Sequence, residues 1–171
     1  RRYRIVTVAE SRKPITTKGG ITLTPDITID ALDPNESAML IMPGADSWLT
    51  GANMAFVEAA GKFLEAEVPV AAICGATVGL ARGGLLNDVN HTSNAPQVLE
   101  SPGYTGHDRY QHELAVRDGN LITASAVGPV EFARAIFDAL EFYPEHTADN
   151  WYLMYGKKDA AGFFGLMEGA S

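Results

Sequence analysis

The chain has 171 residues, carries a formal net charge of −8 at pH 7, and is 46% hydrophobic and 20% charged. This length and composition are typical of one globular domain that buries about two-thirds of its unfolded surface, so we predict a single domain over residues 1–171. The acidic balance excludes a nucleic-acid surface, the single cysteine favours a reducing, cytoplasmic compartment, and no apolar run reaches the roughly 20 residues of a membrane span.

The first half of the chain shows the patterns of two strands and a helix. Residues 3–9 are rich in β-branched side chains and predict a strand, and residues 27–29 predict a short extended segment. Residues 38–42 form a continuous apolar run closed by a Pro-Gly pair, which is typical of a buried strand. Residues 53–67 carry apolar side chains on one helical face and predict an amphipathic helix.

The central stretch is the apolar run of residues 68–73, which ends at Cys74 and is followed by a helical pattern over residues 77–86. It predicts a buried parallel strand with a nucleophile elbow at Cys74, a sharp turn that needs small neighbours such as Gly75. The free N–H groups at the start of the following helix favour a thiolate there. The alternative interpretation is that Cys74 fills space in the core, as buried cysteines often do.

The second half continues the alternation of strands and helices. A short helix is predicted to begin at Pro96, and two apolar segments within residues 114–124 flank a turn, which predicts a hairpin. Residues 128–142 predict a helix, and the aromatic tail from Ala148 predicts two short helices. We expect the side chains of the tail to pack in the core, and the alternative is a contact with a second copy of the chain. The whole pattern predicts an α/β fold with a mostly parallel sheet and helices on both faces.

A catalytic cysteine needs a base and donors for a developing oxyanion. His91 lies in the loop after the helix that follows Cys74, and we predict that it is the catalytic base. The backbone N–H groups of Gly44, Ala45 and Gly75 are the predicted oxyanion donors and substrate-binding groups, because parallel strands end at the same edge of a sheet. The alternative for His91 is a loop histidine that satisfies a backbone group.

The sequence carries no cofactor signature. The Gly-x-Gly-x-x-Gly fingerprint and the phosphate-binding loop are both absent. His107, Asp108, His112 and Glu113 are close in sequence, but the two histidines are five residues apart and lack the spacing of a zinc site. We therefore expect no cofactor and no metal, and we interpret these four residues as a solvated loop.

Four segments resemble the PfpI/ThiJ superfamily, which includes class I glutamine amidotransferase-like proteins, intracellular proteases and amidases, chaperones, and glyoxalase or deglycase enzymes. These segments are residues 40–48, 71–77, 90–94 and 120–124, and their order and spacing match. The resemblance covers roughly residues 4–140 and is nearest to the bacterial amidotransferase-like branch, on the Cys-Gly-Ala-Thr and His-Thr-Ser-Asn runs.

The resemblance implies a flavodoxin-like three-layer sandwich in which Cys74 is the nucleophile, His91 is the loop histidine near it, and Gly44 and Ala45 form the turn that supplies backbone N–H groups. It implies a cysteine-dependent hydrolase, transferase or glyoxalase acting on a small carbonyl or amide compound, and a homodimer. The alternative function is a non-catalytic stress, chaperone or redox-sensing protein in which Cys74 is oxidised.

The chain departs from the superfamily pattern in two places. Protease-type members place a histidine directly after the cysteine, where this chain has Gly75, so a protease activity is not carried over. Members also begin with a further strand and helix that carry an acid/base glutamate. We expect such a unit of about 20–35 residues ahead of Arg1, because an interior strand cannot be removed without leaving unpaired backbone groups.

Overall fold

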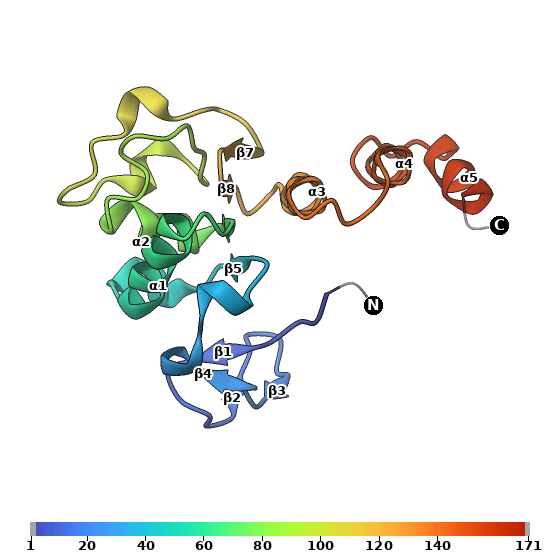
Figure 1. The fold of residues 1–171 in the computed structure, drawn as a ribbon. Helices are drawn as coiled ribbons and strands as arrows, with labels where there is room; N and C mark the ends of the chain where they lie inside the picture. The colour runs from blue at the N-terminus through green and yellow to red at the C-terminus, as the bar shows by residue number, and fades with distance from the viewer. Residues whose placement is uncertain (1–2, 170–171) are drawn as a thin grey trace.

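The computed structural model describes residues 3–169 and contains a four-stranded central sheet (Figure 1). Strands β5, β6 and β8 run parallel, and β7 pairs antiparallel with β8 through a tight hairpin. The prediction of a mostly parallel sheet with an antiparallel hairpin is therefore confirmed. In the order β5-β6-β8-β7, the strands are Leu40–Met42, Val70–Ile73, Leu121–Ala124 and Ala115–Asp118.

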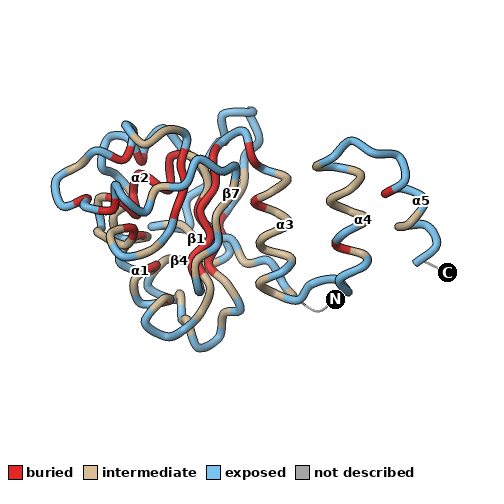
Figure 2. The backbone as a smooth tube through the Cα atoms, turned by 90° about the horizontal axis from the view of Figure 1, so that it is seen from above, coloured by how far each residue is buried: buried red, intermediate tan, exposed pale blue. Residues whose placement is uncertain are grey.

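Helices cover both faces of this sheet and give it three layers. α1 (Met54–Glu65) and α2 (Gly75–Arg82) pack on one face, where Phe63 and Leu80 lie in the larger of two apolar clusters. α3 (Pro129–Ala139) packs on the other face, where its Phe132 meets side chains of β6 and β8. Figure 2 shows that the buried residues are concentrated in the sheet and the adjoining helices. The predicted α/β class follows from this burial on both faces.

The register of the sheet brings three loops to one edge. Met42 at the end of β5 pairs with Ala72 of β6, and Ile73 pairs with Ala124 at the end of β8. The residues that follow these strands therefore flank Cys74, which follows Ile73. This is the carboxyl edge of the sheet, where ligands of open α/β sheets bind.

The N-terminal strands form two small sheets apart from the central one (Figure 1). β1 (Val8–Ala9) pairs in parallel with β4 (Ile27–Thr28), and β2 (Ile15–Thr16) pairs antiparallel with β3 (Thr22–Leu23). The strand predicted over residues 3–9 is wrong for residues 3–7, where no neighbouring strand supplies a ladder and Ile5 is 89% exposed. Within residues 3–169, β1 pairs only with β4 and β5 only with β6, and the expected further strand and helix stay a prediction.

Two helices extend the chain beyond α3. α4 (Glu145–Tyr155) packs on α3, and α5 (Ala161–Glu168) packs on α4, so the three helices lead away from the sheet (Figures 1 and 2). Their existence was predicted, but the prediction that their aromatic residues pack in the core is wrong for α5, where Phe163 and Phe164 are exposed. In α4, Trp151 is half-buried against Phe137 of α3. None of the helices in residues 3–169 is long and apolar enough to cross a membrane.

Short 3₁₀ turns occupy several of the connections. The helix predicted to begin at Pro96 is one of them, because only four residues take a helical conformation before the chain turns. The 3₁₀ turns are Ile29–Ala31, Pro34–Glu36, Asp46–Thr50, Pro96–Leu99 and His107–Arg109.

Candidate active site at the carboxyl edge of the sheet

Cys74 stands at the turn between β6 and α2, as the sequence predicts. Its backbone has φ 58° and ψ −127°, a conformation that an L-residue adopts at a cost of about 1–3 kcal/mol. The Cys74 N–H donates to the carbonyl oxygen of Ala124 at 2.9 Å, which fixes the turn to β8. The thiol is partly buried and is not in a disulfide.

Two glycines leave the space that this turn requires. A Cβ added to Gly44 would lie 2.7 Å from the Cβ and 3.2 Å from the Sγ of Cys74. A Cβ added to Gly75 would lie 2.6 Å from the carbonyl oxygen of Ala45. The distances of 2.7 Å and 2.6 Å are far below a van der Waals contact, so the sequence has glycine where the loop after β5 meets the start of α2.

The loop that carries Gly44 is held against α2. The indole N–H of Trp48 donates to the carbonyl oxygen of Pro43 at 3.0 Å, and the buried ring lies over Gly79 of α2. The guanidinium of Arg82 donates to the carbonyl oxygens of Trp48 and Leu49, at 2.6 Å and 2.8 Å. Both ends of the loop are therefore fixed by side chains.

The structure gathers Gly44, Ala45 and Gly75 around Cys74. The N–H of Gly75 belongs to the first turn of α2, where helix N–H groups have no acceptor within the helix. Donors of this kind, held by fixed backbone, can stabilise negative charge that develops on a substrate oxygen. Their role as oxyanion donors stays a prediction.

His91 lies in a buried cluster of aromatic rings. Its side chain has no exposed surface, its Nδ1 lies 2.8 Å from the carbonyl oxygen of Val89, and its Nε2 lies 2.8 Å from the hydroxyl of Tyr104. A carbonyl only accepts, so Nδ1–H donates to Val89 and Nε2 accepts from Tyr104. Burial lowers the pKa of His91, which favours this neutral form.

The hydrogen bonds of His91 in this structure therefore run to Val89 and Tyr104. Among the described residues, the side chain that hydrogen-bonds the Cys74 sulfur is Asn94, not His91. The alternative prediction from the sequence was a histidine that satisfies a backbone group, and the contact with Val89 is of that kind. The catalytic role of His91 stays a prediction.

Asn94 is the site residue that sequence reasoning missed. Its Nδ2 donates to Cys74 Sγ at 3.4 Å, and its Oδ1 accepts from the backbone N–H of Ala126 at 2.8 Å. The signal was present, because Asn94 ends the same His-Thr-Ser-Asn run that begins at His91. A search for a base passes over an amide, which neither gains nor loses a proton near neutral pH.

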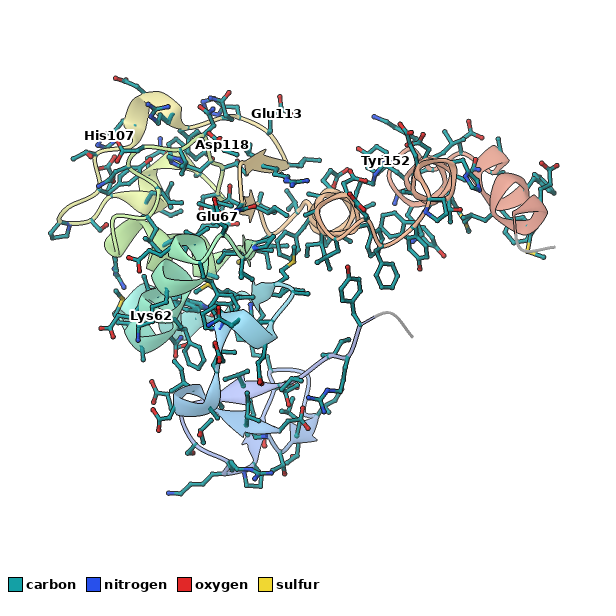
Figure 3. All side chains as sticks on the ribbon, viewed as in Figure 1. Lys62, Glu67, His107, Glu113, Asp118 and Tyr152 are labelled. Atoms are coloured by element: carbon teal, nitrogen blue, oxygen red, sulfur yellow. The ribbon has the colours of Figure 1, made fainter. Side chains whose placement is uncertain are left out.

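The acidic and histidine residues of the loop before β7 do not gather into a metal site. No group of three or more His, Cys, Asp or Glu side chains within residues 3–169 is placed to hold a metal. Figure 3 shows His107 and Glu113 well apart. The Nδ1 of His107 lies 3.4 Å from Oε1 of Glu100 instead. All four side chains named in the sequence are exposed, as a solvated loop requires.

The chain is therefore an α/β protein with helices on both faces of a parallel sheet. Its cysteine stands in a strained strand-to-helix turn at the carboxyl edge of that sheet. The model of the DJ-1/PfpI family matches residues 1–139, and the chain belongs to this family. It is 36% identical over 166 residues to the Bacillus subtilis protein named uncharacterized protease YoaZ, covering 96% of this chain and 79% of that one. It is 34% identical to a second Bacillus subtilis protein, named uncharacterized protease YdeA, over 79% of this chain and 68% of that protein.

Solved structures show the same fold. A thiJ/pfpI family protein from Bacillus anthracis superposes with a TM-score of 0.87 at 36% identity, over 95% of this chain and 78% of that chain. The DJ-1 superfamily protein Atu0886 from Agrobacterium tumefaciens gives a TM-score of 0.82 at 33% identity, over 90% of this chain and 83% of that chain. The resemblance found in the sequence is therefore confirmed.

Proposed function

We propose that this protein is a cysteine-dependent enzyme, of hydrolase, amidotransferase-like or glyoxalase/deglycase type, that acts on a small carbonyl or amide compound. The observation that carries the proposal is the strained backbone of Cys74, held against Gly44 at the carboxyl edge of the sheet. Strain of this kind persists where the surroundings over-determine it, and it collects at active sites. The word protease in the names of the two Bacillus subtilis relatives supports a hydrolase-type reaction.

The chemistry begins with attack by the sulfur of Cys74 on the carbonyl carbon. The sulfur electron pair forms the C–S bond, and the π pair of the carbonyl moves to its oxygen. The N–H groups of Gly44, Ala45 and Gly75 would bind that oxyanion. With an amide, the intermediate collapses and expels the amine after protonation, and water then releases the acyl group. With an aldehyde, the adduct is a hemithioacetal.

Proton transfer is assigned to His91 in this proposal. The Nε2 of His91 accepts from Tyr104 in this structure, so in this proposal that hydrogen bond opens when the ring takes up the proton. Protease-type members of the family carry a histidine directly after the cysteine. This chain has Gly75 at that position, which favours a reaction other than proteolysis.

The proposal includes a small-molecule substrate, a cytoplasmic location and a homodimer. The exposed side chains of Phe163, Phe164 and Met167 on α5 support an interface between copies, because large apolar side chains are seldom left together in solvent. Small-angle scattering measures the assembly directly, and a monomer at all concentrations would count against the dimer.

A panel assay tests the enzyme proposal. The wild-type protein and Cys74→Ser are compared on glyoxals, simple amides and isonitriles, with product formation measured against a blank without protein. We expect turnover of at least one class by the wild-type protein and its loss in Cys74→Ser, since a serine hydroxyl ionises far less readily than a thiol and is a far weaker nucleophile. Equal activity of the two proteins would overturn the assignment of Cys74 as the nucleophile.

The alternative is a redox-sensing protein in which Cys74 is oxidised to a sulfenic or sulfinic acid. The partial exposure of this single thiol favours it. Peroxide treatment followed by intact-mass measurement separates the two functions. Rapid addition of one or two oxygen atoms at Cys74, with no turnover in the panel assay, supports the sensor over the enzyme.

A further inference from the structure

We propose that Asn94 is a catalytic residue whose amide N–H stabilises the thiolate of Cys74. The inference rests on the proposed function, in which Cys74 is the nucleophile. The Nδ2 of Asn94 lies 3.4 Å from Cys74 Sγ, within the range of a hydrogen bond to sulfur. Within residues 3–169, no other side chain donates a hydrogen bond to this sulfur.

The orientation of the Asn94 amide is fixed by its other end. Oδ1 accepts from the backbone N–H of Ala126 at 2.8 Å, just after the end of β8. Turning the amide over would place its NH₂ against the N–H of Ala126, so that two donors would face each other. It would also place the amide oxygen against the sulfur, where it would repel a thiolate. The donor of Asn94 therefore faces Cys74.

The loop that carries Asn94 is held at the two preceding residues. The N–H of Thr92 donates to the hydroxyl of Thr123 in β8 at 2.9 Å, and the hydroxyl of Thr92 donates to the carbonyl oxygen of Glu113 at 2.7 Å. The hydroxyl of Ser93 lies 2.7 Å from that of Thr77 in α2. These contacts are buried, so the loop is fixed before any substrate binds.

One of these contacts ties the Asn94 loop to the cysteine itself. The hydroxyl of Thr77 donates to the carbonyl oxygen of Cys74 at 2.6 Å, so the hydroxyl of Ser93 donates in turn to Thr77. The backbone of Cys74 and the residue before Asn94 thus share one hydroxyl. This chain of hydrogen bonds ties the loop of Asn94 to the turn of Cys74.

The chemistry of this arrangement follows from the charge of the nucleophile. A thiolate is the reactive form of cysteine, and an N–H donor directed at sulfur favours the thiolate over the thiol. As the thiol ionises its proton leaves to the base, which the proposed function assigns to His91, and the sulfur pair then attacks the substrate. Asn94 contributes a neutral donor and needs no change in its own protonation.

The test measures alkylation of Cys74 by iodoacetamide, which needs no substrate and no turnover. Asn94→Asp keeps the shape of the side chain and the acceptor for Ala126 but directs a carboxylate oxygen at the sulfur. We expect alkylation at about pH 7 to slow by about tenfold or more in Asn94→Asp and by about threefold in Asn94→Ala. At about pH 10, above the ordinary pKa of a cysteine thiol of about 8.5, the rates should converge.

The matched control is Asn87→Ala. The amide of Asn87 also bridges two loop segments, through Gly103 and Thr105, but does not touch Cys74. Its alkylation rate should equal that of the wild-type protein. Because Asn94 is exposed, its variants should fold, and circular dichroism with urea unfolding verifies this for both substitutions.

The outcomes separate this inference from the proposed function. Unchanged alkylation in both Asn94 variants, or equal slowing at both pH values, overturns the role of Asn94 while leaving Cys74→Ser to decide the enzyme activity. Slower alkylation confined to neutral pH supports Asn94 even if no substrate in the panel is turned over. Where turnover is found, it should fall with the alkylation rate in Asn94→Asp.

Discussion

Gly44 lies so close to Cys74 that a Cβ at position 44 would stand 2.7 Å from the Cβ of the cysteine. The two residues follow neighbouring parallel strands, and their loops meet because β5 and β6 end in register. A backbone without a side chain is therefore part of the wall of the site. This contact leads to the first of four predictions.

Gly44→Ala should disturb both stability and the thiol. The new methyl group must displace Cys74 or the loop after β5, at a cost of about 1–3 kcal/mol in the free energy of unfolding. The displaced sulfur should also alkylate at a changed rate. Urea unfolding and iodoacetamide kinetics measure the two effects.

Gly61→Ala is the control for this substitution. Gly61 lies inside α1, and the nearest atom to an added Cβ is 3.9 Å away. Replacing a helical glycine that has room should raise the free energy of unfolding by about 0.5–1 kcal/mol. If the two variants behave alike, the close contact between Gly44 and Cys74 is not what constrains the site.

Arg82→Gln should loosen the loop after β5. The substitution removes the two donors that bind the carbonyl oxygens of Trp48 and Leu49, and it should lower the free energy of unfolding by about 1–2 kcal/mol. Hydrogen exchange should become faster in residues 43–50. The exposed Arg117, whose guanidinium donates to Gly119 in its own hairpin turn, provides the control variant Arg117→Gln. Equal exchange of this loop in both variants would contradict the anchoring role of Arg82.

Thr77→Val should destabilise the protein although the shape of the side chain is kept. It removes the hydroxyl shared by Cys74 and Ser93, leaving a buried Ser93 hydroxyl without its partner, at a cost of about 1–3 kcal/mol. Thr77→Ser keeps the hydroxyl and should be the more stable of the two variants in urea. The reverse order would mean that packing of the methyl group outweighs the hydrogen bonds.

The burial of His91 makes stability depend on pH. Its pKa in the folded protein is below the value of about 6.5 expected in the unfolded chain, so the unfolded chain binds more protons between these two values. The contribution of His91 is fully present above about pH 6.5 and is lost as the pH falls toward the folded pKa.

Urea unfolding between about pH 5 and 8 measures this dependence. In His91→Gln, the decline of stability with falling pH should be smaller than in the wild-type protein. His146→Gln changes an exposed histidine of α4 and should leave the decline as it is. An equally steep decline in His91→Gln would show that other groups cause it.

The sequence by itself determined the central features of this protein. The apolar runs of β6 and β8 are nearly continuous, because strands covered on both faces have no polar side to display. The end of β6 was equally plain, since Cys74 and Gly75 interrupt the apolar run at the point where α2 begins. These features are local, so neighbouring residues are enough to predict them, together with the family resemblance that they carry.

Only the tertiary structure decided which side chain of the His-Thr-Ser-Asn run meets the cysteine. The loop between α2 and β7 has no hydrophobic period, so nothing in its local sequence shows which way each side chain faces. Its path is set by contacts with distant segments: Thr123 of β8 and Thr77 of α2 hold Thr92 and Ser93, and Tyr104 binds His91. These contacts direct Asn94 to the sulfur and leave the imidazole in the core, where Val89 and Tyr104 supply partners for both of its nitrogens.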